Sequence, residues 1–451
     1  MVQHPASLSV FLSRIGYNSP QVMRIIHFKS IVHWLTTPNS SSDIKKSNFI
    51  NVQVDAIGVG LANGAAPFLP VFLTRLGASS YEVSLLTSMP AMAGLAFSIF
   101  LGVFLQKRSN IVRWFSLARL FYILSYAIIG LMAFFIPPNR LVASILSVWA
   151  IATIPQTLLT ITFSVVMNAV AGPRGRYELL TRRWSIMGIT TAVTVFVIGK
   201  FLDRVVFPLN YQIVFLALSL GGFVSYYFSS QLDLPKAQPA SSPPVVAPPK
   251  TLRVKITNYV QPILLQKAFI SFSLKRFIYL FGFSMGLPLF PLFFVRQLHV
   301  SDSWIATVNT IQTSLMIAGY FFWAQLSRKR GSRIVLAITT LGMSAYPILT
   351  AITPVTYPIL IYAGFAGVFQ AGIDLVFFDE LMKTIPPAYS ATFVSLAQSM
   401  QHFASIVAPI IASMLSESLG IGIALVISGI IRLSASALFA LTKPARFQAA
   451  P

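Results

Sequence analysis

Cysteine is absent from this chain of 451 residues, and acidic residues are scarce, with 11 Asp and Glu against 33 Lys and Arg. Without cysteine there are no disulfides, no thiolate metal ligands and no thiol nucleophile. Charged residues make up only 10% of the chain, whereas soluble domains carry about a quarter. Such a composition cannot cover the surface of a soluble globule, so an ordinary soluble protein is excluded.

Sequence motifs for nucleotide binding and for metal-dependent catalysis are missing as well. The chain has no Gly-x-x-x-x-Gly-Lys-Ser/Thr sequence, which argues against ATP-driven pumping, and no His-Glu-x-x-His sequence. Paired catalytic carboxylates are not evident either. We therefore expect a protein that is not an enzyme and that needs neither a cofactor nor a metal.

What the chain does contain is apolar sequence, with 55% hydrophobic residues and a mean hydropathy of +0.75. A helix that crosses the hydrocarbon core needs about 20 mostly apolar residues. The sequence predicts twelve such spans, at 50–74, 82–105, 114–136, 141–167, 184–206, 211–230, 277–297, 303–326, 333–352, 356–378, 391–415 and 420–441. The predicted fold class is therefore an all-α polytopic membrane protein.

The basic residues lie mostly on one side of these spans. Of the 33, 26 fall in the N-terminal segment, in the loops after the even-numbered spans or in the C-terminal tail. Cytoplasmic loops are enriched in Lys and Arg, so both termini are expected in the cytoplasm. The net charge of +22 thus indicates orientation and contact with anionic lipids at the cytoplasmic face, and no nucleic-acid partner is expected.

Five segments follow from this pattern. Residues 1–48 mix apolar and basic residues, which predicts interfacial amphipathic helices; a mobile or mis-assigned start is the alternative. Residues 49–232 and 277–442 form two bundles of six spans each. A Pro-rich and basic cytoplasmic linker, 233–276, joins them, and 443–451 is a short cytoplasmic tail.

The two bundles repeat one another at an offset of 221 residues. PFLPVFLTR begins at Pro67 and PLFPLFFVR begins at Pro288, so that Arg75 aligns with Arg296. At the same offset the basic pair Lys107-Arg108 aligns with Arg328-Lys329. Parallel repeats of six spans are a known transporter architecture. The prolines of both repeats are expected to bend the first span of each half.

With its repeated six-span halves, central loop and short basic loops, the chain resembles the major facilitator superfamily over 49–442. Members often carry a Gly-x-x-x-Asp-Arg-x-Gly-Arg-Arg type motif after span 2. This chain has GVFLQKRSN from Gly102 and WAQLSRKRGSR from Trp323, which keep the basic part of the motif and lack the Asp. The resemblance implies pseudo-symmetric halves, alternating access, and a central cavity that spans 1, 4, 7 and 10 line.

Charged residues in these loops are candidates for a cytoplasmic gate. The sequence GRYELLTRR, which begins at Gly175, places Glu178 and Arg182 four residues apart on one helix face. A topology signal with helix solvation is the alternative. The gate candidates are Gln106, Lys107, Arg108, Glu178, Arg182, Arg328 and Lys329.

Ionisable residues within spans are costly and need a reason. Asp55 and Arg119 lie at nearly equal depth in spans 1 and 3, and Asp374 and Arg432 lie within an arginine's reach in spans 10 and 12. The sequence therefore predicts two Asp–Arg pairs. They are either fixed ion pairs or sites where proton binding biases the conformation. His402 in span 11 is either a proton relay or a hydrogen-bonded structural histidine.

Uncharged polar side chains complete the candidates. The resemblance favours Asn63, Gln156 and Gln370 as substrate contacts, with interhelical hydrogen bonding as the alternative. The expected function is a monomeric secondary transporter in the cell (inner) membrane that moves a small organic solute. Coupling to protons and export are the favoured mode. A transporter-like sensor or scaffold without transport is the alternative from another class.

Overall fold

The computed structural model describes residues 37–38, 44–106, 108, 110–234, 266–384 and 390–441. Most of the predicted N-terminal segment, most of the linker and the tail therefore lie outside the described residues. Within the described part the chain is helical and contains no strand. In the first half the helices are α3 (Lys46–Asn63), α4 (Phe68–Arg75), α5 (Ser80–Gln106), α6 (Ile111–Phe135), α7 (Pro138–Leu202) and α8 (Leu209–Ser230).

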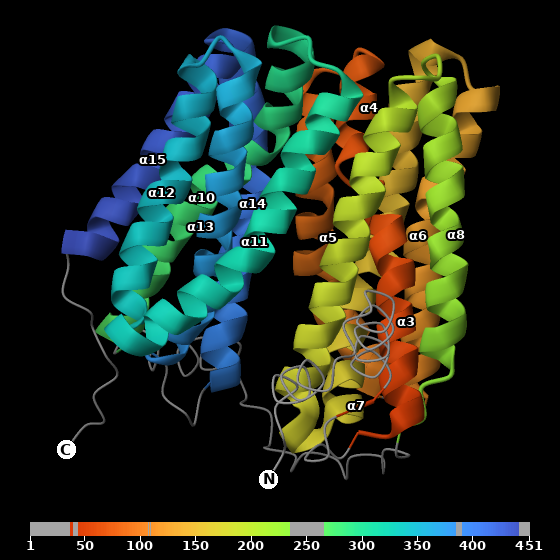
Figure 1. The fold of residues 1–451 in the computed structure, drawn as a ribbon, viewed down its shortest axis with the longest axis vertical. Helices are drawn as coiled ribbons and strands as arrows, with labels where there is room; N and C mark the ends of the chain where they lie inside the picture. Colours follow the sequence, from red (N-terminus) through yellow and green to blue (C-terminus); the bar gives the residue numbers. More distant parts are fainter. Residues whose placement is uncertain are drawn as a thin grey trace, which may run out of the picture.

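The second half repeats this arrangement. Its elements are α10 (Lys267–Leu292), the π-helix η1 (Phe293–Gln297), α11 (Asp302–Arg330), α12 (Ser332–Ile352), α13 (Thr356–Met382), α14 (Ser390–Ser418) and α15 (Ile421–Leu441). Figure 1 shows the halves as two bundles that come together at the upper end and diverge toward the lower end. The halves meet where α5 packs against α14 and α7 packs against α11.

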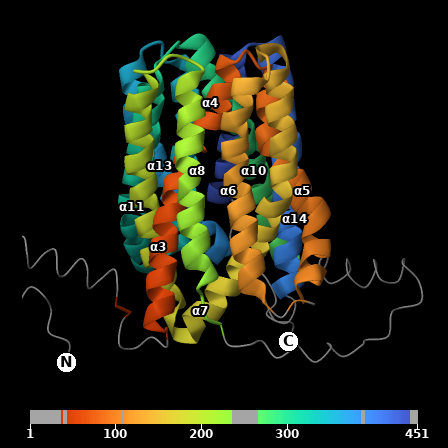
Figure 2. The same cartoon turned by 90° about the vertical axis from the view of Figure 1, so that its right-hand side faces the viewer.

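Every predicted span falls mostly on helical residues, but the elements differ from twelve separate helices. α7 is helical throughout Pro138–Leu202 and contains two apolar stretches, Asn139–Ala171 and Leu179–Leu202, where the sequence predicted two spans. Figures 1 and 2 show α7 turning back at the lower end of the molecule. In the described residues, ten helical stretches are long and apolar enough to cross a membrane, and α5 and α11 are not among them. The count of twelve spans and the cytoplasmic termini stay predictions.

The repeated prolines lie at a break in the first span of the first half and inside a continuous helix in the second half. α3 ends at Asn63, and α4 begins at Phe68, directly after Pro67. In the second half Pro288 and Pro291 lie inside α10, which passes into η1. A proline removes a backbone donor and clashes with the preceding turn, which accounts for the break before α4. The bend expected in the second half stays a prediction.

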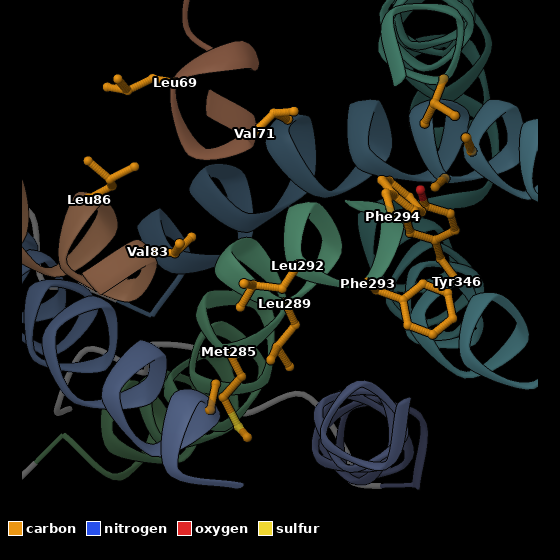
Figure 3. Close-up of a cluster of buried hydrophobic side chains, with 14 of the residues drawn as sticks. Leu69, Val71, Val83, Leu86, Met285, Leu289, Leu292, Phe293, Phe294 and Tyr346 are labelled. Carbon is orange, nitrogen blue, oxygen red and sulfur yellow. The ribbon is translucent and has the colours of Figure 1, made fainter. Parts of the chain in front are cut away.

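One apolar cluster joins the two halves at the end where α4 and η1 lie. It includes Leu69 and Val71 of α4, Val83 and Leu86 of α5, and Leu289 and Leu292 of α10 (Figure 3). A separate cluster, which includes Phe49, Phe115 and Val166, belongs to the first half alone. The halves therefore share one continuous core at this end.

Candidate functional site

A buried charge cluster lies inside the first half. Asp55 is 1% exposed, and its two carboxylate oxygens lie 2.5 Å and 2.6 Å from Nη1 of Arg119. Arg183 donates through Nη2 to Asp55 at 3.3 Å, and the Ser225 hydroxyl donates to Asp55 at 2.6 Å. One carboxylate thus faces two arginines. The structure joins Asp55 and Arg119, as their depths indicated, and adds a second cation.

Close contact between α3 and α8 positions this cluster. A Cβ on Gly58 would lie 2.7 Å from the carbonyl oxygen of Gly221 and 2.8 Å from the Ser225 nitrogen. Only glycine allows the two backbones to approach this closely. The Ser225 hydroxyl therefore reaches Asp55. The guanidinium groups also lie on aromatic faces, Arg119 at 4.4 Å from the Phe115 ring centre and Arg183 at 4.8 Å from that of Phe163.

The predicted pair in the second half is wrong, because Asp374 and Arg432 form no ion pair. Arg432 is 1% exposed and donates through Nη2 to the Phe283 carbonyl at 3.3 Å. Its Nε and Nη1 atoms are buried and have no hydrogen-bond partner. The side chain lies against Gly282 and Gly286 of α10. The similar depths of Asp374 and Arg432 in the membrane made the pair possible. The orientation of α15 about its axis, however, directs Arg432 toward α10.

Asp374 instead has uncharged partners, in a cluster between α11 and α13. The Tyr320 hydroxyl donates to Oδ2 of Asp374 at 2.9 Å, and Nε2 of Gln370 donates to Oδ1 at 2.7 Å. The Asp374 side chain is exposed, and it makes no ion pair with a described Lys or Arg. Two of the predicted site residues, Asp374 and Gln370, therefore lie together, and Tyr320 joins them.

Small residues bring α11 and α13 close enough for this contact. A Cβ on Gly319 of α11 would lie 2.9 Å from the carbonyl oxygen of Val368, and Gly367 of α13 lies against the backbone of Gln312. The Trp323 indole donates to the same Val368 carbonyl at 2.7 Å. This packing holds Tyr320 over the turn that carries Gln370 and Asp374.

A reciprocal contact, which we name the arginine clasp, joins the halves where α4 and η1 lie. It consists of Arg75 and Arg296 with the groups that they bind. Arg75 reaches Oδ1 of Asp302 at 2.7 Å and donates to the Val300 carbonyl at 3.0 Å. Arg296 donates to the Ala78 carbonyl and, at 3.4 Å, to the Ser80 hydroxyl. Each arginine thus binds the turn that follows the other.

Further hydrogen bonds cross between the halves near the arginine clasp. The Asp203 carboxylate accepts from the backbone nitrogens of Asp302 and Ser303, at the start of α11. Ser88 donates to the Ile406 carbonyl at 3.1 Å, and Thr310 donates to the Ala192 carbonyl at 3.2 Å. These contacts extend the closure of this end toward the middle of the bundle.

His402 also lies between the halves. Its ring atom Cε1 is 3.0 Å from the position that a Cβ on Gly94 would take. The imidazole of α14 therefore packs on α5 where a larger residue would not fit. This placement puts His402 at the interface between the halves, and its role as a relay stays a prediction.

Of the two other polar candidates, Asn63 donates to Sδ of Met187 at 3.7 Å. Gln156 is half-buried, and its Oε1 atom is buried and lacks a partner. Neither residue contacts the Asp374 cluster in the described hydrogen bonds. Their role as substrate contacts stays a prediction.

The gate candidates lie at the end opposite the arginine clasp. Arg108, Arg328 and Lys329 are exposed. Arg182 is buried, donates to the Thr37 carbonyl at 3.0 Å and lies 5.2 Å from the Phe49 ring centre. Lys107 and the side chains of Gln106 and Glu178 lie outside the described residues, so the predicted Glu178–Arg182 contact is untested.

A carboxylate–lysine group at this end was not predicted. Lys383 lies 2.7 Å from Asp379 and 2.8 Å from Glu380, and it also donates to the Ser332 hydroxyl of α12. Partial burial lowers the pKa of Lys383, but the two carboxylates outweigh that effect and raise it. The group ties the end of α13 to the start of α12.

Four participants were missed at the sequence level, and a signal existed for three of them. Arg183 was assigned to the loop after span 4, although it directly precedes the predicted start of span 5. Arg75 and Arg296 were aligned by the repeat, but no partner was assigned to them. For Tyr320 no signal was visible, because its role depends on how α11 and α13 pack.

Comparison with known proteins places this geometry in a family. Residues 272–450 match the model described as Major Facilitator Superfamily. The MFS-type transporter YybF of Bacillus subtilis (strain 168) is 24% identical over 151 residues, which are 34% of this chain and 37% of that protein. The match thus spans well under half of the relative's length.

Solved structures resemble the chain over most of its length. A mutant of the nucleoside transporter NupG has a TM-score of 0.65 at 12% identity and covers 87% of this chain and 99% of that chain. The xylose transporter XylE from E. coli, in an inward open conformation, has a TM-score of 0.62 at 12% identity, with coverages of 88% and 94%. A bacterial homolog of the human lysosomal transporter Spinster has a TM-score of 0.64 at 14% identity, with coverages of 90% and 98%.

At these identities the structures show the fold, and the sequence matches show similarity to the family over part of the chain. The apolar helices, the repeated halves and the family model over residues 272–450 agree with one another. The chain is a multi-pass integral membrane protein whose residues 272–450 match the major facilitator superfamily.

Proposed function

We propose that this protein is a secondary transporter that moves a small organic solute across the cell membrane by alternating access. The observation that carries the proposal is an unequal contact between the halves. At one end they share an apolar core and the arginine clasp, whereas the helices diverge toward the other end (Figure 1). Two bundles that meet at one end can rock about their interface.

The orientation of this state follows from the basic residues. Arg108, Arg328, Lys329 and Lys383 lie at the end away from the arginine clasp, and cytoplasmic loops are the ones enriched in Lys and Arg. Under this orientation the clasp closes the extracytoplasmic side. The conformation described here is then inward-facing.

The two intramembrane carboxylates are proposed to have different roles. Asp55 is fully buried and bound by Arg119, Arg183 and Ser225, so it anchors α3, α6, α7 and α8 to one another. Asp374 is exposed and has only uncharged partners. We propose that a proton couples to transport at Asp374, and that the direction is export.

Flux in proteoliposomes tests the proposal. Purified protein is reconstituted with a pH-sensitive dye in the lumen, a pH gradient is imposed, and candidate solutes are added. Wild-type protein is expected to move protons in response to a transported solute, and Asp374→Asn is expected to lose this response. Asp379→Asn, an exposed carboxylate of the same helix, serves as the matched control.

The alternative is a sensor or scaffold that binds a solute without moving it. Its signature is a solute that stabilises the purified protein but gives neither solute uptake nor proton movement. Such a result contradicts transport. Solute flux that persists undiminished in Asp374→Asn retains transport and removes the coupling role of Asp374.

A further inference from the structure

The cluster of Asp374, Tyr320 and Gln370 has an unusual balance of hydrogen-bonding groups. The Tyr320 hydroxyl and one N–H of the Gln370 amide each donate to the Asp374 carboxylate, which leaves one N–H of Gln370 as a donor. The other amide atom, Oε1 of Gln370, is buried and has no partner. A carboxylate oxygen and a phenol oxygen each keep a free lone pair after one hydrogen bond. Apart from that one N–H, what the cluster still offers is therefore acceptors.

The charge of the cluster is also uncompensated. Asp55 and Asp302 each contact an arginine, at 2.5 Å and 2.7 Å, whereas Asp374 makes no ion pair with a described Lys or Arg. A carboxylate surrounded by apolar helices is costly unless a cation or a proton neutralises it. The chain itself supplies no such cation among the described residues around Asp374.

The face of α13 that carries the cluster points away from lipid. Ile361 and Phe365, which are 62% and 59% exposed, mark an apolar face suited to lipid. Successive residues turn by about 100°, so Gln370 and Asp374 lie about 180° and 220° around the helix from Ile361. An exposed carboxylate on the face opposite the lipid looks into the interior of the transporter, where a solute passes.

From these observations we infer that Asp374, with Gln370 and Tyr320, binds the protonated amine of the transported solute. The inference rests on the proposed transport function and adds the chemical class of the substrate. An ammonium group supplies up to three donors and the missing positive charge, which match the free acceptors and the unpaired carboxylate. An anionic solute meets repulsion from Asp374, which the single remaining N–H of Gln370 does not offset.

The roles within the cluster differ. Asp374 makes the ionic contact, and the Oε1 atom of Gln370 accepts a second hydrogen bond from the ammonium. Tyr320 is a positioning residue, since its hydroxyl holds one carboxylate oxygen. A proton on Asp374 removes the charge that holds the amine, so proton and amine compete for one group.

Three probes with a common phenyl body and different charge test the inference: phenethylamine, 2-phenylethanol and 3-phenylpropionate. Their affinities are measured by thermal stabilisation of the purified full-length protein. Phenethylamine is expected to bind wild-type protein at least tenfold more tightly than 2-phenylethanol, and 3-phenylpropionate is expected to give no stabilisation. In Asp374→Asn the affinity for the amine should fall at least tenfold, while Asp379→Asn should retain it.

Tyr320→Phe separates positioning from folding. It should lower the ratio of amine affinity to alcohol affinity and leave the alcohol affinity unchanged. A general structural defect would weaken both probes together, and that result overturns the role of Tyr320.

Several results overturn the inference as a whole: equal binding of the anion and the amine, unchanged amine affinity in Asp374→Asn, or no stabilisation of wild-type protein by phenethylamine. If Asp374→Asn loses a pH response but keeps its amine affinity, Asp374 is a proton site only, and the inference fails. Amine binding without flux retains the amine site and removes the transport function. Flux of other solutes that is unchanged in Asp374→Asn retains the transport function and removes the amine site.

Discussion

Arg75 and Arg296 occupy equivalent positions of the two repeats, and each binds the turn that follows the other. The offset of 221 residues that relates the two sequences therefore relates the two halves of one contact. Arg75 holds Asp302 and the Val300 carbonyl, and Arg296 holds the Ala78 carbonyl and the Ser80 hydroxyl. A duplicated span with an arginine at its end thus provides both sides of a reciprocal contact between the two halves.

Removing the arginine clasp should favour the opposite conformation. A hydrogen bond to a charged group contributes about 1.5–3 kcal/mol, and about 1.4 kcal/mol changes an equilibrium tenfold. Arg75→Ala and Arg296→Ala are each expected to shift the population of the conformation open at the clasp end about tenfold or more. Because the protein has no cysteine, a single introduced thiol reports this shift.

Ser88→Cys is a suitable reporter for that shift. Ser88 is fully buried, and its hydroxyl crosses to the Ile406 carbonyl of the other half. The rate at which a membrane-impermeant maleimide labels this thiol should rise in both clasp variants. Arg140→Ala, which removes an exposed arginine, is the control and should leave the rate unchanged. Equal labelling in clasp variants and control would show that the clasp does not hold this end closed.

The two intramembrane carboxylates should differ sharply in their effect on stability. Breaking a buried pair by removing one partner costs about 3–5 kcal/mol, because the other charge stays buried and unpaired. Asp55→Asn leaves both Arg119 and Arg183 without a counter-ion, so it should lower the free energy of unfolding by about that amount. Asp374→Asn, at an exposed site with uncharged partners, should change it by less than about 1 kcal/mol.

Thermal unfolding of the two variants in the same detergent, followed by loss of the monodisperse peak on size exclusion, measures this difference. Arg119→Ala adds a check, since Asp55 then keeps Arg183 and Ser225. A smaller loss than in Asp55→Asn is expected. Similar melting temperatures for Asp55→Asn and Asp374→Asn would mean that the buried cluster does not anchor the first half.

The contact between α3 and α8 gives a test at a single methyl group. Gly58→Ala places a Cβ at 2.7 Å from the Gly221 carbonyl oxygen, a distance at which the helices must separate. Overpacking of this kind costs about 1–3 kcal/mol, and it also draws Ser225 away from Asp55. Gly188→Ala is the matched control, because its nearest neighbour, Cδ1 of Ile317, would be 3.4 Å away. The melting temperature should fall in the first variant and change little in the second.

How far the sequence predicts this molecule depends on what each pattern encodes. Apolar runs and prolines determine where helices form and bend, so the spans and the break before α4 were predictable. Depth along a helix follows from residue counting, which is why Asp55 was correctly matched to Arg119. Rotation about the helix axis depends on the packing of α10 and α15. For that reason the same counting matched Asp374 with Arg432 wrongly.

The candidate site shows the same limit. Gln370 and Asp374 lie four residues apart, so their contact within α13 is a local property. Tyr320 comes from α11, and its place depends on Gly319 and Gly367 meeting across two helices. A single sequence does not reveal which glycines make interhelical contacts. The contact between Gln370 and Asp374 was therefore predictable from the sequence, and the contribution of Tyr320 from a second helix was not.

Arg432 presents the opposite case to Arg119, since both arginines are buried but only one has a carboxylate. Nε and Nη1 of Arg432 have no partner, and a buried donor without a partner costs about 1–3 kcal/mol. Methionine has a similar length and no polar hydrogen to satisfy, so it can lie between Gly282 and Gly286 in place of the guanidinium. Arg432→Met should therefore leave the melting temperature unchanged or raise it.

The same substitution at Arg119 provides the comparison. Arg119→Met removes the closest counter-ion of Asp55 and leaves that carboxylate with Arg183 at 3.3 Å, so the melting temperature should fall. Because both changes replace a buried arginine with methionine, loss of side-chain volume and of positive charge is equal in the two variants. A fall of equal size at both positions would show that Arg432 has a stabilising partner, and a rise at position 432 alone would confirm that its charge is uncompensated.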